Sequence, residues 1–195
     1  NGSGIYTPGL VPLRQCARSM QTLQFQYEPR RILLVLPTWV GDVVMASPFI
    51  DGLFQRFDNA EITLLMNRHL YPLLEGSPWV ERCEFWSRRN KTPEAKQQRR
   101  EQLARLRAQQ FDLAVMLPNS LRSAWLCFRA GAKRRVGFNR DGRRLLLTDP
   151  VAVPNRIKGG YEPLPLCDYY AVLAGALGMP HPGDALTLYL TDEAD

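Results

Sequence analysis

The stretch RILLVLPTWVGD, residues 31–42, opens with five consecutive apolar residues, Ile32 to Leu36, and closes in a polar turn. A short, continuous apolar run is typical of a parallel strand that is covered by helices on both faces. From Val43 to Phe57 the apolar residues recur every three or four positions, which predicts a helix. A buried strand followed by a turn and a helix is the repeating unit of a parallel α/β sheet.

The same alternation of strands and helices continues along the chain. Further strands are expected at residues 61–66, 80–86, 111–117 and 134–138, and helices at 68–74, 92–110, 120–130 and 165–177. An extended segment at 145–153 and a last strand at 185–190 complete the pattern. This order predicts one Rossmann-like, doubly wound parallel sheet over residues 31–190. Residues 1–30 lack periodicity and are expected to form a loose leader, with order beginning at Arg31.

The composition excludes several classes of protein. With 195 residues, 45% hydrophobic and 23% charged, the chain can bury a core, which excludes a disordered or collagen-like protein. The net charge of +6 favours an anionic partner: nucleic acid, phosphorylated lipid or a nucleotide sugar. No apolar run reaches the roughly 18 residues of a transmembrane helix. The cysteines show no metal-ligand spacing and are expected to be reduced; they are Cys16, Cys83, Cys127 and Cys167.

The loop after the first strand is the first candidate site, because open parallel sheets bind ligands at the carboxyl ends of their strands. Gly41 lets the backbone approach a ligand or adopt a positive φ. Asp42 has two interpretations: an N-cap of the following helix, or a general base that takes a proton from a substrate hydroxyl. The loop matches neither GxGxxG nor GxxxxGK[ST], which argues against NAD and P-loop chemistry.

A second polar loop, residues 118–123, follows the strand at 111–117. Asn119 and Ser120 either cap the next helix or contact a ligand. Arg122 lies in the first turn of that helix, where a cation is unfavourable unless it meets an anion.

Two clusters of basic residues are further candidates for binding an anionic partner. The first surrounds the helix expected at 92–110 and contains Arg88, Arg89, Lys91, Lys96, Arg99, Arg100, Arg105 and Arg107. It is either a solvated helix face or a platform for anionic membrane lipid. The second contains Lys133, Arg134, Arg135, Arg140, Arg143 and Arg144. Arginines bind phosphate in a bidentate way, so this cluster is a candidate for holding a phosphorylated acceptor.

Three segments together resemble a known family. They are RILLVLPTWVGDVVMASP (31–48), LPNSLRSAWLCFRAG (117–131) and RRVGFNRDGRRLLLTD (134–149). They are similar to the ADP-heptose:lipopolysaccharide heptosyltransferases, glycosyltransferase family 9, and most of all to the heptosyltransferase II group. The W-V-G-D loop and the P-N-S segment, in this order, are far more specific together than either is alone.

The resemblance implies a GT-B architecture, in which two Rossmann-like domains face each other across a cleft. Residues 31–190 would be the N-terminal, acceptor-side domain, and 191–195 the start of a linker to a nucleotide-sugar domain that is missing here. By the same resemblance Asp42 would be the general base. The substrate-binding residues would be Thr38, Trp39, Gly41, Asn119, Ser120 and Arg122, with Arg68, Arg140 and Arg143 contacting acceptor phosphates.

The implied function is an inverting transfer of heptose from ADP-heptose to a heptose of the lipopolysaccharide inner core. ADP-heptose would be the donor, no metal or cofactor would be required, and the lipopolysaccharide acceptor would be met at the inner membrane surface. The protein would be cytoplasmic, with peripheral attachment to that membrane, and the chain would be inactive without its other half. The alternatives are a non-catalytic module that binds anionic glycolipid and another GT-B sugar transferase. No RRM, KH or zinc signature supports nucleic-acid binding.

Overall fold

The fold is built on a parallel sheet whose strands alternate with helices along the chain. The computed structural model describes residues 22–86, 92–154, 156–157, 159–182 and 185–186. Within these residues the sheet has six strands in the order β3-β2-β1-β4-β5-β6. The strands are β1 (Arg31–Val35), β2 (Glu61–Met66), β3 (Cys83–Phe85), β4 (Leu113–Met116), β5 (Arg134–Phe138) and β6 (Asp149–Val151). The predicted Rossmann-like α/β fold is confirmed.

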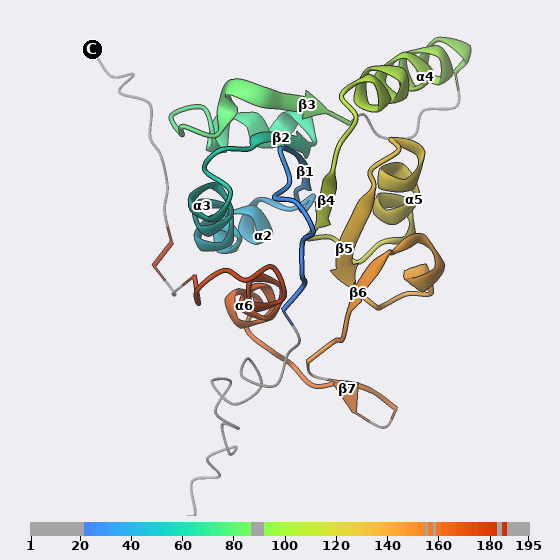
Figure 1. Cartoon of the computed structure of the whole chain (residues 1–195). Coiled ribbons are helices and arrows are strands. Elements are labelled where there is room, and N and C mark those ends of the chain that lie inside the picture. Colours follow the sequence, from blue (N-terminus) through green and yellow to red (C-terminus); the bar gives the residue numbers. More distant parts are fainter. Residues whose placement is uncertain (1–21, 87–91, 155, 158, 183–184, 187–195) are drawn as a thin grey trace, which may run out of the picture.

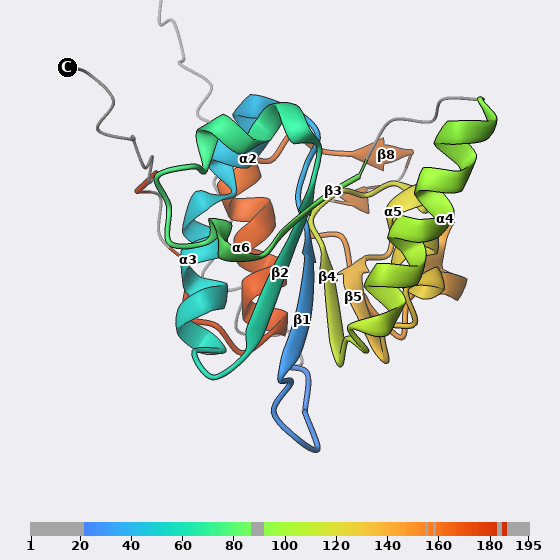
Figure 2. The same cartoon turned by 90° about the horizontal axis from the view of Figure 1, so that it is seen from above.

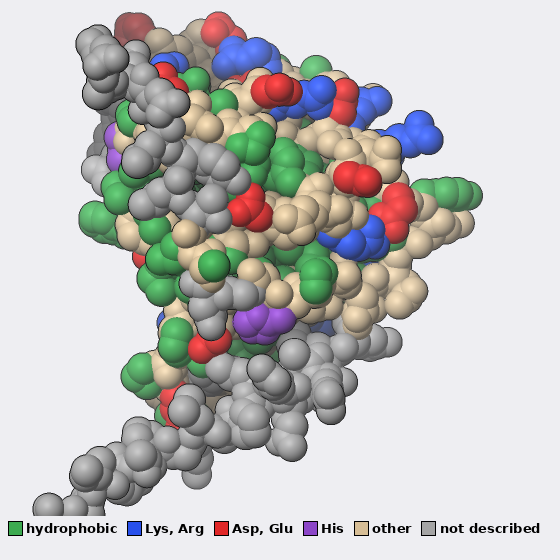
Figure 3. Space-filling view, turned by 90° about the vertical axis from the view of Figure 1, so that its left-hand side faces the viewer, with side chains coloured by type: hydrophobic (Ala, Val, Ile, Leu, Met, Phe, Trp, Pro, Cys, Tyr) green, Lys and Arg blue, Asp and Glu red, His purple; other side chains and the backbone are tan. Residues whose placement is uncertain are grey.

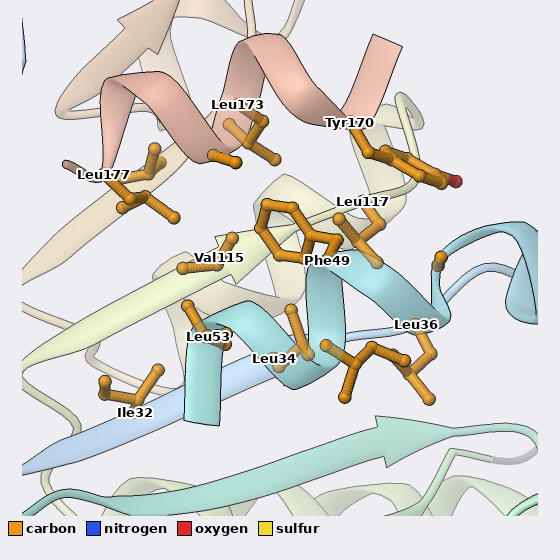
Figure 4. Close-up of a cluster of buried hydrophobic side chains, with 14 of the residues drawn as sticks. Ile32, Leu34, Leu36, Phe49, Leu53, Val115, Leu117, Tyr170, Leu173 and Leu177 are labelled. Atoms are coloured by element: carbon orange, nitrogen blue, oxygen red, sulfur yellow. The ribbon is translucent and has the colours of Figure 1, made fainter. Parts of the chain in front are cut away.

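Helices cover both faces of the sheet (Figures 1 and 2). One face carries α2 (Val40–Met45), α3 (Ser47–Arg56) and α6 (Leu166–Ala176), and the other carries α4 (Pro93–Ala108) and α5 (Leu121–Arg129). Successive side chains of a strand point to opposite faces, so the residues of β1 are shared between two cores. Leu34 packs in the core that contains Phe49 of α3 (Figure 4), whereas Leu33 packs with Leu106 of α4. Because β1 is a central strand covered on both faces, its successive residues must all be apolar.

The strand order reverses at β1. Strands β2 and β3 lie on one side of β1, and β4, β5 and β6 lie on the other. Parallel pairing aligns Val35 at the end of β1 with Leu65 of β2 and Met116 of β4. Since the crossovers from these strands leave in opposite directions, a crevice opens at their carboxyl ends, which is the usual place for a ligand in this kind of fold.

The single helix expected at 43–57 is wrong, because the structure has two helices, α2 and α3, separated at Ala46. Pro48 lies in the first turn of α3 and has no amide hydrogen with which to continue the hydrogen bonding of α2. The hydroxyl of Ser47 instead donates a hydrogen bond to the carbonyl of Val44 at 2.8 Å. Helix α2 also begins at Val40, which places Asp42 inside its first turn.

The remaining elements are short. They are the 3₁₀ helices η1 (Arg68–Leu73), η2 (Val80–Arg82) and η3 (Arg143–Leu146), and the hairpin of β7 (Arg156–Ile157) with β8 (Gly160–Tyr161). The extended segment expected at 145–153 is thus the end of η3 followed by β6. Of the last strand expected at 185–190, residues 185–186 are irregular and the others lie outside the described residues.

The expectation of a loose leader is wrong for residues 22–30. The amide of Leu23 donates to the carbonyl of Ala176 at the end of α6, at 2.8 Å. The ring of Phe25 packs edge-on against Phe57, and Glu28 pairs with Arg56 at 2.9 Å. These contacts hold residues 22–30 on the domain, although the sequence of this segment has no periodic pattern. Residues 1–21 lie outside the described part of the chain.

Candidate functional site

Two neighbouring hollows open at the carboxyl edge of the sheet. One, of about 170 Å³, lies beyond β1, β2 and β4 and includes Asn67 and Arg122 in its lining. The other, of about 280 Å³, is lined by Asp42, Asn119 and two tyrosines of α6. Both hollows are bordered by Thr38, Pro118 and Ser120. The two polar loops predicted to form a site therefore meet at one place.

Asp42 is not the N-cap of its helix. That position belongs to Trp39, which has extended backbone and makes no side-chain capping bond. Asp42 lies in the first turn of α2, where a negative charge is favoured by the helix dipole, and its half-buried side chain borders the second hollow. The N-cap interpretation is therefore wrong. A carboxylate at the wall of a hollow can accept a hydrogen bond from a ligand bound there.

Two tyrosines of α6 complete the wall of this hollow. Burial, together with the nearby carboxylate of Asp42, raises the pKa of Tyr170. Burial also raises the pKa of Tyr169, although hydrogen bonds from Asn119 and Arg140 act in the opposite direction. The side-chain amide of Asn119 donates to the hydroxyl of Tyr169 at 3.0 Å. Both phenols thus stay neutral and supply fixed polar groups around Asp42.

Ser120 caps helix α5, as one of its two interpretations predicted. Its hydroxyl accepts a hydrogen bond from the amide of Ser123 at 3.2 Å. The same residue borders both hollows, so capping and ligand contact do not exclude each other. Asn119 does not cap this helix, because the N-cap is Ser120 and the side-chain oxygen of Asn119 accepts from Arg143 instead.

Arg143 does not lie on the surface, so its predicted contact with an acceptor phosphate is wrong. The side chain is fully buried. Its guanidinium donates to the carbonyls of Phe138, at 2.9 Å, and Pro118, and to the side-chain oxygen of Asn119 at 3.2 Å. Burial lowers the pKa of this guanidinium. Arg143 fixes the loop that lines the site and does not face the solvent.

The other two predicted phosphate contacts lie beside the hollows. Arg140 stacks on the ring of Tyr161 at 4.0 Å and also reaches the hydroxyl of Tyr169, so it adjoins the second hollow through that phenol. Arg68 stacks on the ring of Phe85 at 4.3 Å. It lines a separate hollow that shares only Trp86 with the first one.

Trp39 and Gly41 lie on the outer side of the first loop. The side chain of Trp39 is 71% exposed. Gly41 has no positive φ, so that part of the expectation is wrong. A Cβ atom added at Gly41 would meet nothing within 4 Å, which leaves its backbone open to a ligand.

Sequence reasoning missed four polar residues at or beside the site, one of which, Asn67, lines the first hollow. Tyr169 and Tyr170 belong to a helix that looks, in the sequence, like ordinary apolar covering of a sheet. The ring nitrogen Nε2 of His69 lies 3.2 Å from the carbonyl oxygen of Thr38 and joins η1 to the first loop. The available signals were the positions of Asn67 and His69 shortly after the carboxyl end of β2.

The described residues contain no group of three or more His, Cys, Asp or Glu that could hold a metal ion. Within the same ranges Cys83, Cys127 and Cys167 are free thiols, in agreement with the prediction for these three, whereas Cys16 lies outside them. None of the helices described is both long and apolar enough to cross a membrane.

The chain is similar to heptosyltransferases in sequence. Residues 99–193 match the family described as glycosyltransferase family 9 (heptosyltransferase). A lipooligosaccharide heptosyltransferase 2 of Haemophilus ducreyi is 29% identical over 85% of this chain and 46% of its own length. Lipopolysaccharide heptosyltransferase 2 of Escherichia coli is 33% identical over 61% of this chain and 34% of its own. The chain therefore spans less than half the length of these curated relatives.

Solved structures agree with this relation. The ADP-heptose lipopolysaccharide heptosyltransferase II of E. coli superposes with a TM-score of 0.56 and 28% identity, over 73% of this chain and 40% of that one. A family 9 glycosyl transferase of Veillonella parvula shares the fold with a TM-score of 0.70 and 18% identity, over 89% of this chain and 48% of that one. In sequence and fold together, this chain is similar to the family 9 heptosyltransferases and matches one Rossmann-like part of their GT-B architecture.

Proposed function

We propose that the protein carrying this chain transfers heptose from ADP-heptose to a heptose of the lipopolysaccharide inner core, with inversion at the anomeric carbon. The observation that carries the proposal is the place of Asp42. It lines a hollow at the reversal point of the sheet, in a chain related to heptosyltransferases 2. The chain would form the acceptor half of the enzyme, and the donor would be held mainly by the other half.

In the proposed reaction Asp42 accepts the proton of the acceptor hydroxyl. The hydroxyl oxygen then forms a bond to the anomeric carbon of heptose, while the bond from that carbon to the phosphate oxygen of ADP breaks. The electron pair leaves with ADP, so charge and atoms balance and the configuration at the carbon is inverted. A base positioned in this way contributes about a hundredfold or more to the rate.

The residues around Asp42 suit the binding of a sugar. The hydroxyls of Thr38 and Ser120 and the amide of Asn119 border the same hollow and can exchange hydrogen bonds with sugar hydroxyls. Arg122 borders the adjoining hollow, where an anionic substituent of the acceptor would offset its unfavourable place in α5. Arg140 and Arg68 would meet acceptor phosphates farther from Asp42.

The test is the substitution Asp42→Asn in the complete gene product, assayed for ADP release in the presence of acceptor. We expect turnover to fall by about a hundredfold or more, with an unchanged thermal unfolding midpoint. The matched control is Asp58→Asn, because Asp58 is exposed at the opposite edge of the sheet and accepts a hydrogen bond from the neighbouring Asn59. This control should turn over normally.

Near-normal turnover of Asp42→Asn would remove Asp42 from the role of base. A wild-type protein that binds acceptor and releases no ADP would instead support the module that binds anionic glycolipid without catalysis. Transfer of a different sugar by the wild-type protein would support another GT-B transferase.

A further inference from the structure

Helix α5 presents apolar side chains to the solvent. Leu121, Trp125 and Phe128 follow one another at spacings of four and three residues, and each is about half exposed. Residues at this spacing share one face of a helix. Leu145 of η3, which packs against α5, is 95% exposed. We call these four residues the α5 patch. Exposed large apolar side chains that gather on one surface mark an interaction site.

Arginines accompany the α5 patch. The guanidinium of Arg129 lies over the ring of Trp125 at 5.1 Å, and that of Arg135 lies over Phe128 at 5.6 Å. Arg122 and Arg144 are exposed and directly adjoin the patch in the chain. Aromatic rings capped by guanidinium groups combine apolar area with positive charge on one surface.

The segment that carries the α5 patch is strongly basic. Residues 121–146 contain eight Lys or Arg and one Asp, a net +7, against +6 for the complete chain. Within this segment Arg143 is buried, and Lys133 and Arg134 pair with Asp112 and Asp149. The arginines that lie beside the patch are Arg122, Arg129, Arg135 and Arg144. By contrast, basic and acidic side chains are interspersed on the face shown in Figure 3. An anionic partner is accordingly expected at the α5 patch.

Helix α4, the other candidate for a lipid platform, lacks apolar anchors. It is rich in arginine, but none of the large exposed hydrophobic side chains of the described residues belongs to it. Its buried residues are Gln102 and Leu106. Charges without an apolar anchor are typical of a solvated helix face. Of the cluster predicted around this helix, residues 88, 89 and 91 lie outside the described part of the chain.

We propose that the α5 patch docks the protein on an anionic lipid membrane. Its apolar side chains enter the boundary between headgroups and acyl chains, and its arginines pair with lipid phosphates. Ser120 stands next to Leu121 and borders both hollows, so the docked surface adjoins the candidate site. The inference rests on the proposed function in one respect, because an acceptor anchored in a membrane would then be presented at the edge of that site.

Vesicle co-sedimentation of the complete gene product tests the proposal without donor or acceptor sugar. We expect binding to vesicles rich in phosphatidylglycerol that is about tenfold or more stronger than binding to pure phosphatidylcholine, and weaker at high salt. The double variant Arg129→Glu and Arg144→Glu should lose about tenfold or more of this binding. Leu145→Ser should weaken vesicle binding about tenfold, because an exposed leucine can insert into the membrane. Since the side chain is exposed, its replacement should leave the protein folded.

Matched controls come from another exposed segment. Tyr27→Ser and Arg30→Glu make the same kinds of change on residues 22–30, where Tyr27 is 81% exposed, and should bind vesicles like the wild type. Trp125→Phe keeps an aromatic ring at this position but removes the indole, so it should abolish the vesicle-induced shift in tryptophan fluorescence. Thermal unfolding of each variant shows that it is folded.

Equal binding to the two kinds of vesicle, or wild-type binding by the patch variants, overturns the proposal. A patch variant that alters self-association but not vesicle binding also overturns it, and makes the patch a protein contact. The Asp42→Asn variant should bind vesicles normally. A failure of docking is thereby distinguished from a failure of the proposed heptose transfer.

Discussion

Arg143 and Arg144 are adjacent in the chain, but their side chains lie in opposite environments. Arg143 is fully buried and satisfies its donors with the carbonyls of Phe138 and Pro118, while Arg144 is exposed. Gly137 makes room for the buried guanidinium, since a Cβ atom there would lie 3.1 Å from Nη2 of Arg143. A basic cluster in a sequence carries no information on which arginine turns inward. For this reason the expectation of a phosphate contact failed at Arg143.

We predict that Arg143→Met lowers the free energy of unfolding by about 2–4 kcal/mol. The substitution leaves buried carbonyl oxygens without donors, and each such group costs about 1–3 kcal/mol. Arg144→Met is the matched control and should change stability by less than about 0.5 kcal/mol, as is usual for exposed positions. Urea unfolding of both variants measures the difference. Equal values would show that the buried guanidinium contributes no stability beyond that of its exposed neighbour.

At the scale of elements, the sequence predicted strands and helices well where one clear period prevailed. Strands β2 and β5 have the predicted bounds, and α4 begins as predicted, with Thr92 as its N-cap accepting from the amide of Ala95 at 3.3 Å. The break between α2 and α3 was missed because a proline in the first turn of a helix is well tolerated. Apolar periodicity runs through Pro48 without a visible interruption, so it cannot separate two short helices from one long helix.

The two N-caps provide a matched pair at this scale. We predict that Ser120→Ala and Thr92→Ala each lower the free energy of unfolding by about 1 kcal/mol, because each removes an acceptor for a helix amide. Only Ser120→Ala should also weaken acceptor binding in the complete gene product, since Ser120 borders both hollows and Thr92 borders neither. Chemical unfolding and the KM for acceptor measure the two effects. A similar rise in KM for both variants would mean that the loss is one of stability alone.

At the scale of the whole molecule, the candidate site could be predicted in part from topology. Thr38 and Asp42 follow β1, and Asn119 and Ser120 follow β4, so pairing of these strands brings the two loops together. Tyr170 follows none of these strands, and the packing of α6 against α2 and α3 carries it to Asp42 (Figure 4 shows Tyr170 above the core with Phe49). A contact between segments so distant in sequence leaves no local pattern.

Residues 22–30 act at this largest scale, because they connect elements from both halves of the domain. Phe25 packs against Phe57 after α3, and Arg134 of β5 stacks on the same ring at 4.5 Å while donating to the carbonyl of Gln24 at 2.7 Å. We predict that Phe25→Ala lowers the free energy of unfolding by about 1–3 kcal/mol, less than a fully buried phenylalanine would, since the ring is half-buried. Tyr27→Ala, only two residues away but 81% exposed, should stay within about 0.5 kcal/mol of the wild type. Denaturant unfolding compares the two aromatic positions directly, and an unchanged midpoint for Phe25→Ala would mean that the segment lies on the domain without stabilising it.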